Sequence, residues 1–517
     1  MEYLKGQPRD QMVLYATCLD EVVEDENAVR FIDAFVKSLD MEAIGFARQA
    51  KEGRPSYDPA DLLRLFIYGY MNRIRSSRDL EKACKRNLEV IWLLEGLRPD
   101  HNTINRFRKD NSQAIRRVFR QTVSIARNFD LIGGLLIAGD STKLRAQNSK
   151  KNNFNQKKID RHLAYIDKHL SEYENAMKSA DGDDERDSIQ KDIDDNHKRR
   201  KEYKSLAKQL KESGEKQIST SDPESRHQIV RNNITEVSYT LQSTVDAKHC
   251  IPIDYKVTNA NDKKAMGGML RRAKSILRTT EFTALYDKGY HTGSEFKIAD
   301  ELQIKTLVAI PGIGRNSQAP DPNYNAENFA YDPKTDTYQC PEGHTMKSNG
   351  TRYKGRNGTF KQYKTKACKG CPVRSLCTTA GVNGKIVQRT EYADHIEANA
   401  ERMEACEGLY KQRQAIVEHP FGTIKRQWGF DHVMTKKSMK RASADVGLIF
   451  IAYNLKRIMN LIGMKELIEM LKKLVFGLKI MLRPLLMSQA AITITFTTRN
   501  TKTIKNHFWL NLLSLTG

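Results

Sequence analysis

The chain has 517 residues, which is long enough for several domains whose cores need no disulfides. Its 86 Lys and Arg against 63 Asp and Glu leave a net charge of +23, which is typical of a protein whose partner is a polyanion such as nucleic acid. We expect no signal peptide, because residues 1–10 carry both charge signs, and no membrane span, because charged residues and a proline interrupt the apolar stretch 475–496. These features exclude secreted, membrane and collagen-like classes and predict a cytoplasmic protein.

Residues 1–130 are predicted to form a helical N-terminal domain. Apolar residues recur there at helical spacing, and Asp58 precedes a proline that suits the first turn of a helix. The expected helices span 28–39, a segment after Pro59, 77–87 and about 102–117. The start of the last helix carries Arg106 and Arg108 among Asn and Thr side chains, which is typical of a helix-turn-helix reader of DNA. A helical bundle with solvated arginines is the alternative.

From residue 131 to 311 short apolar strands alternate with helices, which predicts a mixed α/β sheet. Strands are expected at 135–140, 237–245, 251–257, 282–287 and 305–310, and helices at 266–277 and 296–302. Two of these strands end in a carboxylate, Asp140 and Asp287. Because sites in open α/β sheets gather at the carboxyl ends of strands, these two acids are candidate site residues. Asp246 and Asp254 are rival acids, but neither closes an apolar strand.

Two insertions interrupt the sheet. Between 151 and 215 a heptad pattern flanks an Asp- and Gly-rich turn, which predicts an antiparallel helical hairpin. This hairpin holds 15 basic and 15 acidic residues and adds nothing to the net charge, so we interpret it as a spacer or a partner handle. The second insertion, 312–395, is rich in Pro, Gly, Asn and Cys. Helices resume over 396–474, and the tail 475–517 differs in composition and receives no role.

Close carboxylates repel one another, and a divalent cation relieves that repulsion. Hard oxygen ligands favour Mg²⁺ or Mn²⁺, and a third carboxylate would complete a two-metal site for phosphoryl displacement. Glu418 is the candidate, because it follows an apolar run and precedes the cations Lys425 and Arg426. Pro420 predicts a kink or a helix start, which leaves open whether Glu418 and Lys425 share a face. A surface glutamate is the alternative.

Four of the eight cysteines cluster in the second insertion: Cys340, Cys368, Cys371 and Cys377. Four thiolates suit a tetrahedral structural Zn²⁺, and His344 could replace one of them. An iron–sulfur cluster and unligated thiols are the alternatives. The insertion has little apolar material for a core, so we expect a metal to supply its order. Basic and aromatic residues interleave over 352–369, which makes this insertion a candidate DNA-binding surface.

Six sequence blocks then occur in an order that resembles the DDE transposases of bacterial insertion sequences. The blocks are GRPSYDP at 53–59, IRSSRDLE at 74–81, RPDHNTI at 98–104, GDST at 139–142, YDKGY at 286–290 and VEHPFGTIK at 417–425. The resemblance covers roughly residues 10–470 and is nearest to the branch with a long helical N-terminal domain. It implies a ribonuclease-H-like catalytic core in three pieces, 131–150, 216–311 and 396–474.

The same resemblance implies that Asp140, Asp287 and Glu418 hold two Mg²⁺ (or Mn²⁺) ions. The family's signature around the third acid is Tyr, two residues, Arg, three residues, Glu, six residues, Lys. Glu418 and Lys425 match this spacing. Tyr410 and Arg413 match one another, but four residues separate Arg413 from Glu418. These side chains, with Arg426, are the implied DNA contacts near the acids.

The function implied by the resemblance is that of an insertion-sequence transposase. Such an enzyme cleaves double-stranded DNA at the inverted repeats of its element and transfers the ends into target DNA, with Mg²⁺ as cofactor. A homodimer in the synaptic complex, a bacterial cytoplasm and association with the nucleoid are implied as well. A catalytically silent DNA-binding regulator of the element and a non-transposing ribonuclease-H-like nuclease are the alternatives.

Overall fold

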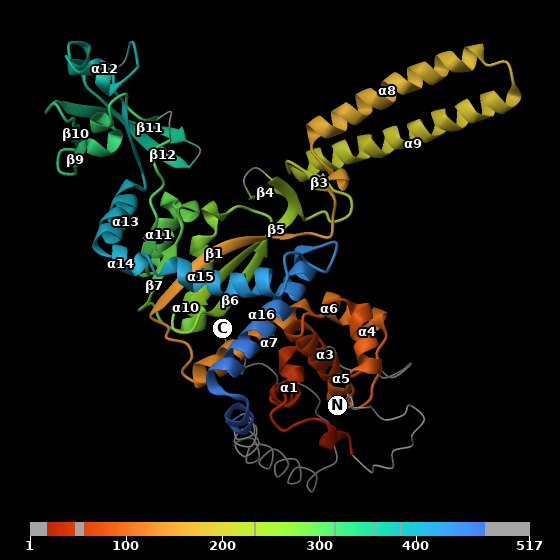
Figure 1. The fold of residues 1–517 in the computed structure, drawn as a ribbon. Helices are drawn as coiled ribbons and strands as arrows, with labels where there is room; N and C mark the ends of the chain where they lie inside the picture. Colours follow the sequence, from red (N-terminus) through yellow and green to blue (C-terminus); the bar gives the residue numbers. More distant parts are fainter. Residues whose placement is uncertain are drawn as a thin grey trace, which may run out of the picture.

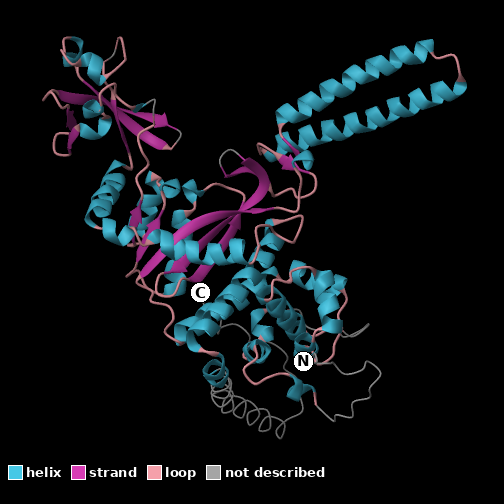
Figure 2. Ribbon diagram, viewed as in Figure 1, coloured by secondary structure: helices cyan, strands magenta, loops and turns pink. Residues whose placement is uncertain are grey.

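The computed structural model describes residues 18–46, 56–231, 234–314, 317–355, 357–382 and 384–470. A central body carries two projections, a long pair of helices and a small β-rich insertion, as Figures 1 and 2 show. The tail 475–517, the segment 1–10 and the first three residues of the 53–59 block lie outside the described residues.

The N-terminal segment is helical, as predicted. Its helices are α1 (Ala28–Lys37), α2 (Met41–Ile44), α3 (Pro59–Met71), α4 (Ser77–Arg86), α5 (Leu88–Leu93), α6 (His101–Asp110) and α7 (Ser112–Asn128). Asp58 caps α3, since its carboxylate accepts the N–H of Ala60 at 2.8 Å. The single helix expected over 102–117 was wrong. Asn111 leaves helical geometry, and its side chain donates to the carbonyl of Phe107 at 2.9 Å, which ends α6 before α7 begins.

The central sheet is mixed, which confirms the predicted α/β class. Its strands are β1 (Leu136–Arg145), β4 (Arg226–Arg231), β5 (Ile234–Asp246), β6 (Ile251–Thr258), β7 (Thr283–Tyr286) and β8 (Lys305–Val308). The order is β4-β5-β1-β7-β8, and β6 also pairs with β5. β5 runs antiparallel to both β1 and β6, whereas β1, β7 and β8 are parallel to one another. The strands β1, β6, β7 and β8 therefore point their carboxyl ends toward the same edge.

Helices from distant parts of the chain cover this sheet. They are α10 (Met266–Leu277), α11 (Gly293–Glu301), α13 (Ala393–Ala405), α14 (Glu407–Tyr410), α15 (Arg413–Phe421) and α16 (Met439–Ile462). α16 packs against α3, α7 and β6, so it joins the N-terminal helices to the sheet through one continuous core. α15 packs on β1 and crosses the sheet in Figure 1.

No single helix among the described residues is long and apolar enough to cross a membrane. α16 reaches the necessary length and hydropathy only together with the helical segment 464–470, across a bend of 108°. Most of α16 is buried inside the protein.

The first insertion contains the predicted helical pair, α8 (Gln156–Ser179) and α9 (Asp183–Ser213). The two helices pack antiparallel: His162 stacks on Tyr203 at 4.8 Å between ring centroids, and Arg200 pairs with Asp167 at 2.8 Å. The short strands β2 (Asn153–Phe154) and β3 (Ile218–Ser219) pair with each other at the base of the arm. The chain therefore leaves the body and returns to it at adjacent points.

The second insertion forms its own antiparallel sheet in the order β13-β12-β11-β10-β9. Its strands are β9 (Ala330–Asp332), β10 (Thr337–Gln339), β11 (Thr345–Gly355), β12 (Gly358–Lys364) and β13 (Val387–Thr390). Aromatic side chains supply most of a small buried core of Phe329, Tyr338, Met346, Tyr363 and Val387. The sequence predicted little apolar material for a core here, and the core that forms is small and built largely from tyrosines, which bury their rings while their hydroxyls bond to polar groups such as Asp336.

Candidate active site

Asp140 and Asp287 meet at one edge of the central sheet. β1 and β7 pair in parallel from Leu136–Thr283 to Ala138–Leu285. Continuing this register by two residues places Asp140 beside Asp287. The expectation that a strand ends at Asp140 was wrong: β1 runs on to Arg145, because its antiparallel pairing with β5 extends beyond the end of β7.

Gly139, which directly precedes Asp140, allows a close approach at this edge. A Cβ atom at Gly139 would lie 2.0 Å from the ring of Tyr286, the residue before Asp287. Only glycine leaves room for that buried ring at this position. The packing of Gly139 on Tyr286 thus brings the two aspartates together.

A third aspartate, Asp262, lies beside the turn that holds Asp287. Asp287 caps the short helix η4 (Lys288–Tyr290), and its carboxylate accepts the N–H of Gly289 at 2.8 Å. A Cβ atom at Gly289 would lie 3.0 Å from Asp287 Oδ1 and 3.7 Å from Asp262 Oδ2. Gln242 fixes Asp262 by donating to its other oxygen at 2.6 Å, and Gln242 in turn accepts the hydroxyl of Tyr290.

The sequence pattern did not indicate Asp262, although one signal was available. The hairpin of β5 and β6 was predicted, and two antiparallel pairings make β6 parallel to β1. The segment after β6 therefore returns to the same edge as Asp140. Asp262 begins the short helix η3 (Asp262–Lys264), four residues beyond that strand.

This acid cluster, Asp140 with Asp262 and Asp287, carries excess negative charge. Burial raises the pKa of Asp140 to about 6, and the charges of Asp287 and Asp262 add to that rise. The Arg413 guanidinium, 3.6 Å from Asp140 Oδ2, and the N–H of Ser141, 2.7 Å from Asp140 Oδ1, oppose it. Of the cations among the described residues, Arg413 interacts with Asp140 and Lys143 interacts with Asp262.

Glu418 lies on α15, the helix that also supplies Arg413. Its side chain is exposed and accepts a hydrogen bond from Gln414 at 2.9 Å. The family signature places its arginine where this chain has Gln414, one residue after Arg413. In the structure Arg413 faces Asp140, and Gln414 faces Glu418. Tyr410 lies near the acid cluster too: burial raises its pKa, and the charges of Asp287 and Asp140 contribute.

Pro420 lies inside α15 and does not end it. Because proline has no N–H, the α-helical ladder cannot continue regularly, and the chain widens into a π-helical turn at η9 (Gly422–Gln427). Lys425 comes from that turn and donates to Thr142 Oγ1 at 2.9 Å and to the carbonyl of Lys143 at 3.1 Å. Lys425 therefore lies against β1 just past Asp140, whereas Arg426 is exposed.

The two N-terminal arginines have different surroundings. Arg106 is exposed on α6. Arg108 is only 2% exposed: its guanidinium donates to the hydroxyl of Tyr70 and the carbonyl of Arg75 and lies 3.6 Å from Asp445. The prediction that Arg108 contacts DNA was wrong, because this side chain is part of a buried ion-pair cluster.

The rival acids are structural. Asp246 accepts the N–H groups of Gly133, Gly134 and Lys248, which orders the loop before β1. Asp254 is buried and paired with Arg272 at 2.5 Å and with Arg120 at 3.2 Å. Both carboxylates therefore have partners within the protein, although burial raises the pKa of Asp254 to about 6.

The four clustered cysteines converge in the second insertion. Burial raises the pKa of Cys377, and charges on Cys368, Cys340 and Cys371 would raise that pKa further, so the four thiols lie within electrostatic range of one another. All four are free thiols, and the N–H of His344 lies 3.3 Å from the Sγ of Cys340. Across the described part of the chain, however, no group of three or more His, Cys, Asp or Glu side chains is arranged to hold a metal ion.

Comparisons with known proteins identify two regions. Residues 17–110 match the family described as Transposase domain (DUF772), and residues 339–459 match the family described as Transposase DDE domain. The second match includes the four cysteines, Glu418 and Lys425. No curated protein sequence matches the chain.

Among solved structures, a piggyBac transposase in a synaptic complex with hairpin DNA is 10% identical, with 87% of this chain and 78% of that chain covered and a TM-score of 0.27. A score this low does not establish a common fold. The two family matches, over the N-terminal helices and over the second insertion with the C-terminal helices, support a DDE transposase, an enzyme that cleaves DNA and transfers its strands.

Proposed function

We propose that this chain is the transposase of a bacterial insertion sequence, which cleaves DNA at the inverted repeats of its element and transfers the ends into target DNA. The observation that carries this proposal is the acid cluster at the sheet edge, where the strand register sets Asp140 beside Asp287 and burial with neighbouring carboxylates raises the pKa of Asp140 against the charge of Arg413. Buried and unbalanced carboxylates are typical of a site that binds a cation.

The core that holds these acids is, in this proposal, ribonuclease-H-like. Support comes from the mixed sheet, from the helices that cover it and from the position of the acids at the carboxyl ends of the parallel strands β1 and β7. The two insertions leave the sheet at its loops and do not interrupt its strand pairing. The N-terminal helices, with Arg106 on the surface, are the proposed DNA-binding domain.

Two Mg²⁺ (or Mn²⁺) ions are the proposed cofactors. The chemistry of the donors suits such ions, because Asp140, Asp287 and Glu418 offer hard oxygens, as does Asp262 next to the turn of Asp287. In the described structure no three of these carboxylates are yet grouped around a metal position, so binding would have to draw them together. When bound, the ions supply charge stabilisation to the phosphate that is cut. Glu418 joins the set if its side chain releases Gln414, since α15 already packs on β1.

The cations around the acids position the DNA. Arg413 and Lys425 come from one continuous helical segment above β1 and lie at the rim of the acid cluster. Their charged N–H groups suit backbone phosphates, and Tyr410 lies beside Arg413. Arg426 is exposed one residue further on and extends this basic rim.

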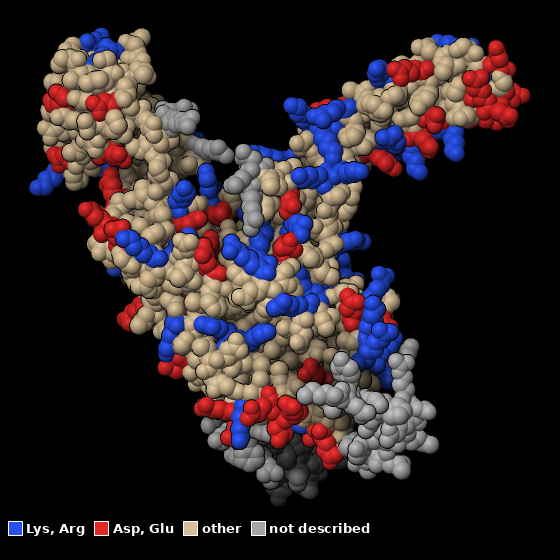
Figure 3. Space-filling view, viewed as in Figure 1, with Lys and Arg blue, Asp and Glu red and all other residues tan. Residues whose placement is uncertain are grey.

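The proposed partner is double-stranded DNA, bound by a homodimer in the synaptic complex and located with the nucleoid in the cytoplasm. Figure 3 shows Lys and Arg gathered on the central body and at the base of the helical arm, while Asp and Glu gather at its tip. That distribution supports DNA on the body between the two projections. Light scattering of the complex formed with end-bearing DNA tests whether two chains bind together.

A cleavage assay tests the proposal. The purified chain is incubated with Mg²⁺ and a duplex that carries the inverted repeats flanking its gene, and Asp287→Asn is compared with Asp187→Asn, which changes an exposed carboxylate on α9. We expect Asp287→Asn to lower cleavage at least about 1,000-fold while binding persists, because a lost metal ligand removes several kcal/mol of transition-state stabilisation. Asp187→Asn should cleave like the wild type.

Three results would contradict the proposal. Retained cleavage by Asp287→Asn removes the acid cluster from catalysis. Binding without cleavage by the wild type indicates a silent regulator of the element. Cleavage without strand joining indicates a non-transposing nuclease.

We also propose that Cys340, Cys368, Cys371 and Cys377 hold one structural Zn²⁺, with His344 as the substitute ligand for one thiol. The support is that four soft ligands are neighbours in a small sheet that has only a minor core. Metal analysis of the purified chain should find about one zinc per chain, and Cys371→Ser should lose it while Cys18→Ser, outside the insertion, retains it. Visible absorption by the purified chain would instead indicate an iron–sulfur cluster.

A further inference from the structure

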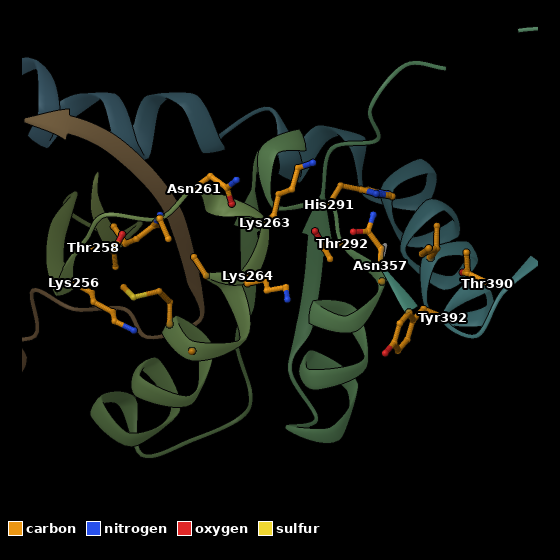
Figure 4. A pocket seen from close by; sticks show the side chains of 17 residues that line it. Lys256, Thr258, Asn261, Lys263, Lys264, His291, Thr292, Asn357, Thr390 and Tyr392 are labelled. Carbon is orange, nitrogen blue, oxygen red and sulfur yellow. The ribbon is translucent and has the colours of Figure 1, made fainter. Parts of the chain in front are cut away.

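A cavity of about 610 Å³ lies beside the acid cluster, where the central sheet meets the base of the second insertion. Figure 4 shows its walls: Lys263 and Lys264 come from η3, His291 and Thr292 follow β7, and Tyr392 comes from the insertion. The volume falls within the range of natural ligand sites, roughly 300–1,000 Å³, and can hold one nucleotide unit.

The charged side chains that line the cavity are all positive. Three lysines line it, Lys256, Lys263 and Lys264, and of the described residues on its walls none is Asp or Glu. A positive lining is unusual immediately beside three aspartates. It indicates a ligand that is an anion.

Two helices also begin at this cavity. α10 starts after Ala265 and α11 after Thr292, and in the described structure neither of these two N-cap side chains caps its helix. The N-terminus of a helix carries a partial positive charge and directs N–H groups outward, which favours a phosphate. Glu295 in the first turn of α11 is buried, accepts the N–H of Gly267 at 2.7 Å and does not line the cavity.

The cavity and the acid cluster share a wall. Gln242 lines the cavity and donates to Asp262, and His291 on the cavity wall lies four residues after Asp287. A ligand with several phosphates can therefore occupy both places at once. A DNA strand has that property, and a single free anion does not.

We propose that this cavity binds a backbone phosphate of the DNA strand whose scissile bond lies at the acid cluster. The inference rests on the proposed function and adds a subsite to it. The lysines and the starts of α10 and α11 hold the phosphate, and the strand is thereby positioned for cleavage at the carboxylates.

Gly268 provides the sharpest test. It lies in the first turn of α10 on the cavity wall, and a Cβ atom there would meet nothing within 4 Å. Gly268→Glu places a negative charge in the cavity, and Gly268→Gln places a neutral side chain of the same size. Glutamate is favourable in the first turn of a helix, so folding is not threatened.

Binding is measured by anisotropy with a labelled duplex carrying the inverted repeats, at 150 mM KCl and without divalent cations. We expect Gly268→Glu to bind at least about ten-fold more weakly than Gly268→Gln. The double variant Lys263→Gln/Lys264→Gln should lower the slope of log affinity against log [KCl] by about one, since the slope falls by roughly one for each phosphate that is no longer neutralised. Lys297→Gln, on α11 but outside the cavity, should behave as the wild type.

Equal DNA binding by Gly268→Glu and Gly268→Gln would overturn the inference. So would a result in which Gly268→Glu loses only the binding of inorganic phosphate, titrated without DNA, because the cavity would then serve a free anion. The Asp287→Asn assay separates the two proposals. If cleavage depends on Asp287 while Gly268→Glu binds normally, only the cavity assignment fails; if the wild type never cleaves but Gly268→Glu weakens binding, only the catalytic assignment fails.

Discussion

Asp445 and the acid cluster of Asp140, Asp262 and Asp287 are surrounded by different amounts of positive charge. Asp445 on α16 is fully buried and meets Arg75 at 2.6 Å, Arg108 at 3.6 Å, the hydroxyl of Tyr70 and the N–H of Met434. Burial by itself would raise the pKa of Asp445, yet Arg75 and Arg108 hold that pKa below its ordinary value. Asp140, by contrast, has a pKa raised to about 6.

The difference separates a structural role from a ligand-binding one. The charge of Asp445 is satisfied within the protein, and its partners from α3, α6 and the loop after α3 attach the N-terminal helices to α16. In the acid cluster three carboxylates face Arg413 and Lys143, so part of their negative charge is available to a bound cation. The partners around each carboxylate, and not its pKa alone, distinguish the two roles, since the pKa of the arginine-paired Asp254 is also raised to about 6.

The largest expected effect is on stability. Asp445→Asn leaves Arg75 and Arg108 buried without their anion, so the free energy of unfolding should fall by about 3–5 kcal/mol. Asp287→Asn removes a repulsion in the metal-free protein and should leave that free energy unchanged or higher. Urea denaturation followed by circular dichroism measures both variants. Similar losses in the two would show that charge balance does not distinguish the groups.

A smaller effect concerns pH. Because the folded pKa of Asp140, about 6, lies above its ordinary value of 3.8, the folded state binds the proton more tightly than the unfolded state. The stabilisation is fully present below about pH 4 and is lost as pH rises through 6, by about 1–2 kcal/mol at roughly 1.4 kcal/mol per pKa unit reduced by screening. Urea midpoints of the metal-free chain between pH 4 and 7 should show this fall in the wild type and a weaker one in Asp140→Asn. Identical profiles would contradict it.

The smallest effect tests the aspartate that the sequence pattern did not indicate. Asp262→Asn keeps a carbonyl oxygen for the hydrogen bond from Gln242 and loses the negative charge. We expect the Mg²⁺ concentration for half-maximal cleavage to rise about ten-fold, which is typical when a group next to the metal ligands is altered. A Mg²⁺ titration of the cleavage rate measures this, with Asp187→Asn as the control. An unchanged titration would place Asp262 outside the metal site.

Local pattern was sufficient for most of the fold. Short apolar runs located β1, β5, β6, β7 and β8, and the heptad spacing located the helical arm. Local pattern could not predict the burial of Arg108, because that burial depends on Asp445 far along the chain. Nor could it predict that β1 continues past Asp140, because that continuation depends on the length of β5. Asp262 lies in a loop without periodicity, so its place follows only from the strand pairing of β6.

The same limit applies to the third acid. Spacing in the sequence identified Glu418 and Lys425 as a pair, and the structure places Lys425 against β1 through a π-helical turn that no spacing rule contains. The extra residue between Arg413 and Glu418 has a visible effect, since Arg413 points at Asp140 while Gln414 takes the hydrogen bond with Glu418. One inserted residue changes the direction in which a side chain points from a helix. A sequence motif with one extra residue can still be matched, so the match does not reveal that change in direction.

The pairing of β2 with β3 has a consequence for how this protein can change. Those two strands hold the outgoing and incoming chain together before α8 begins and after α9 ends. A change in the length of the arm therefore does not alter the position of β1, the strand that carries Asp140. Relatives can lengthen, shorten or exchange this arm without rebuilding the catalytic sheet. A fluorescent domain fused at residues 180–182 would report where the enzyme sits on a chromosome while leaving its chemistry alone.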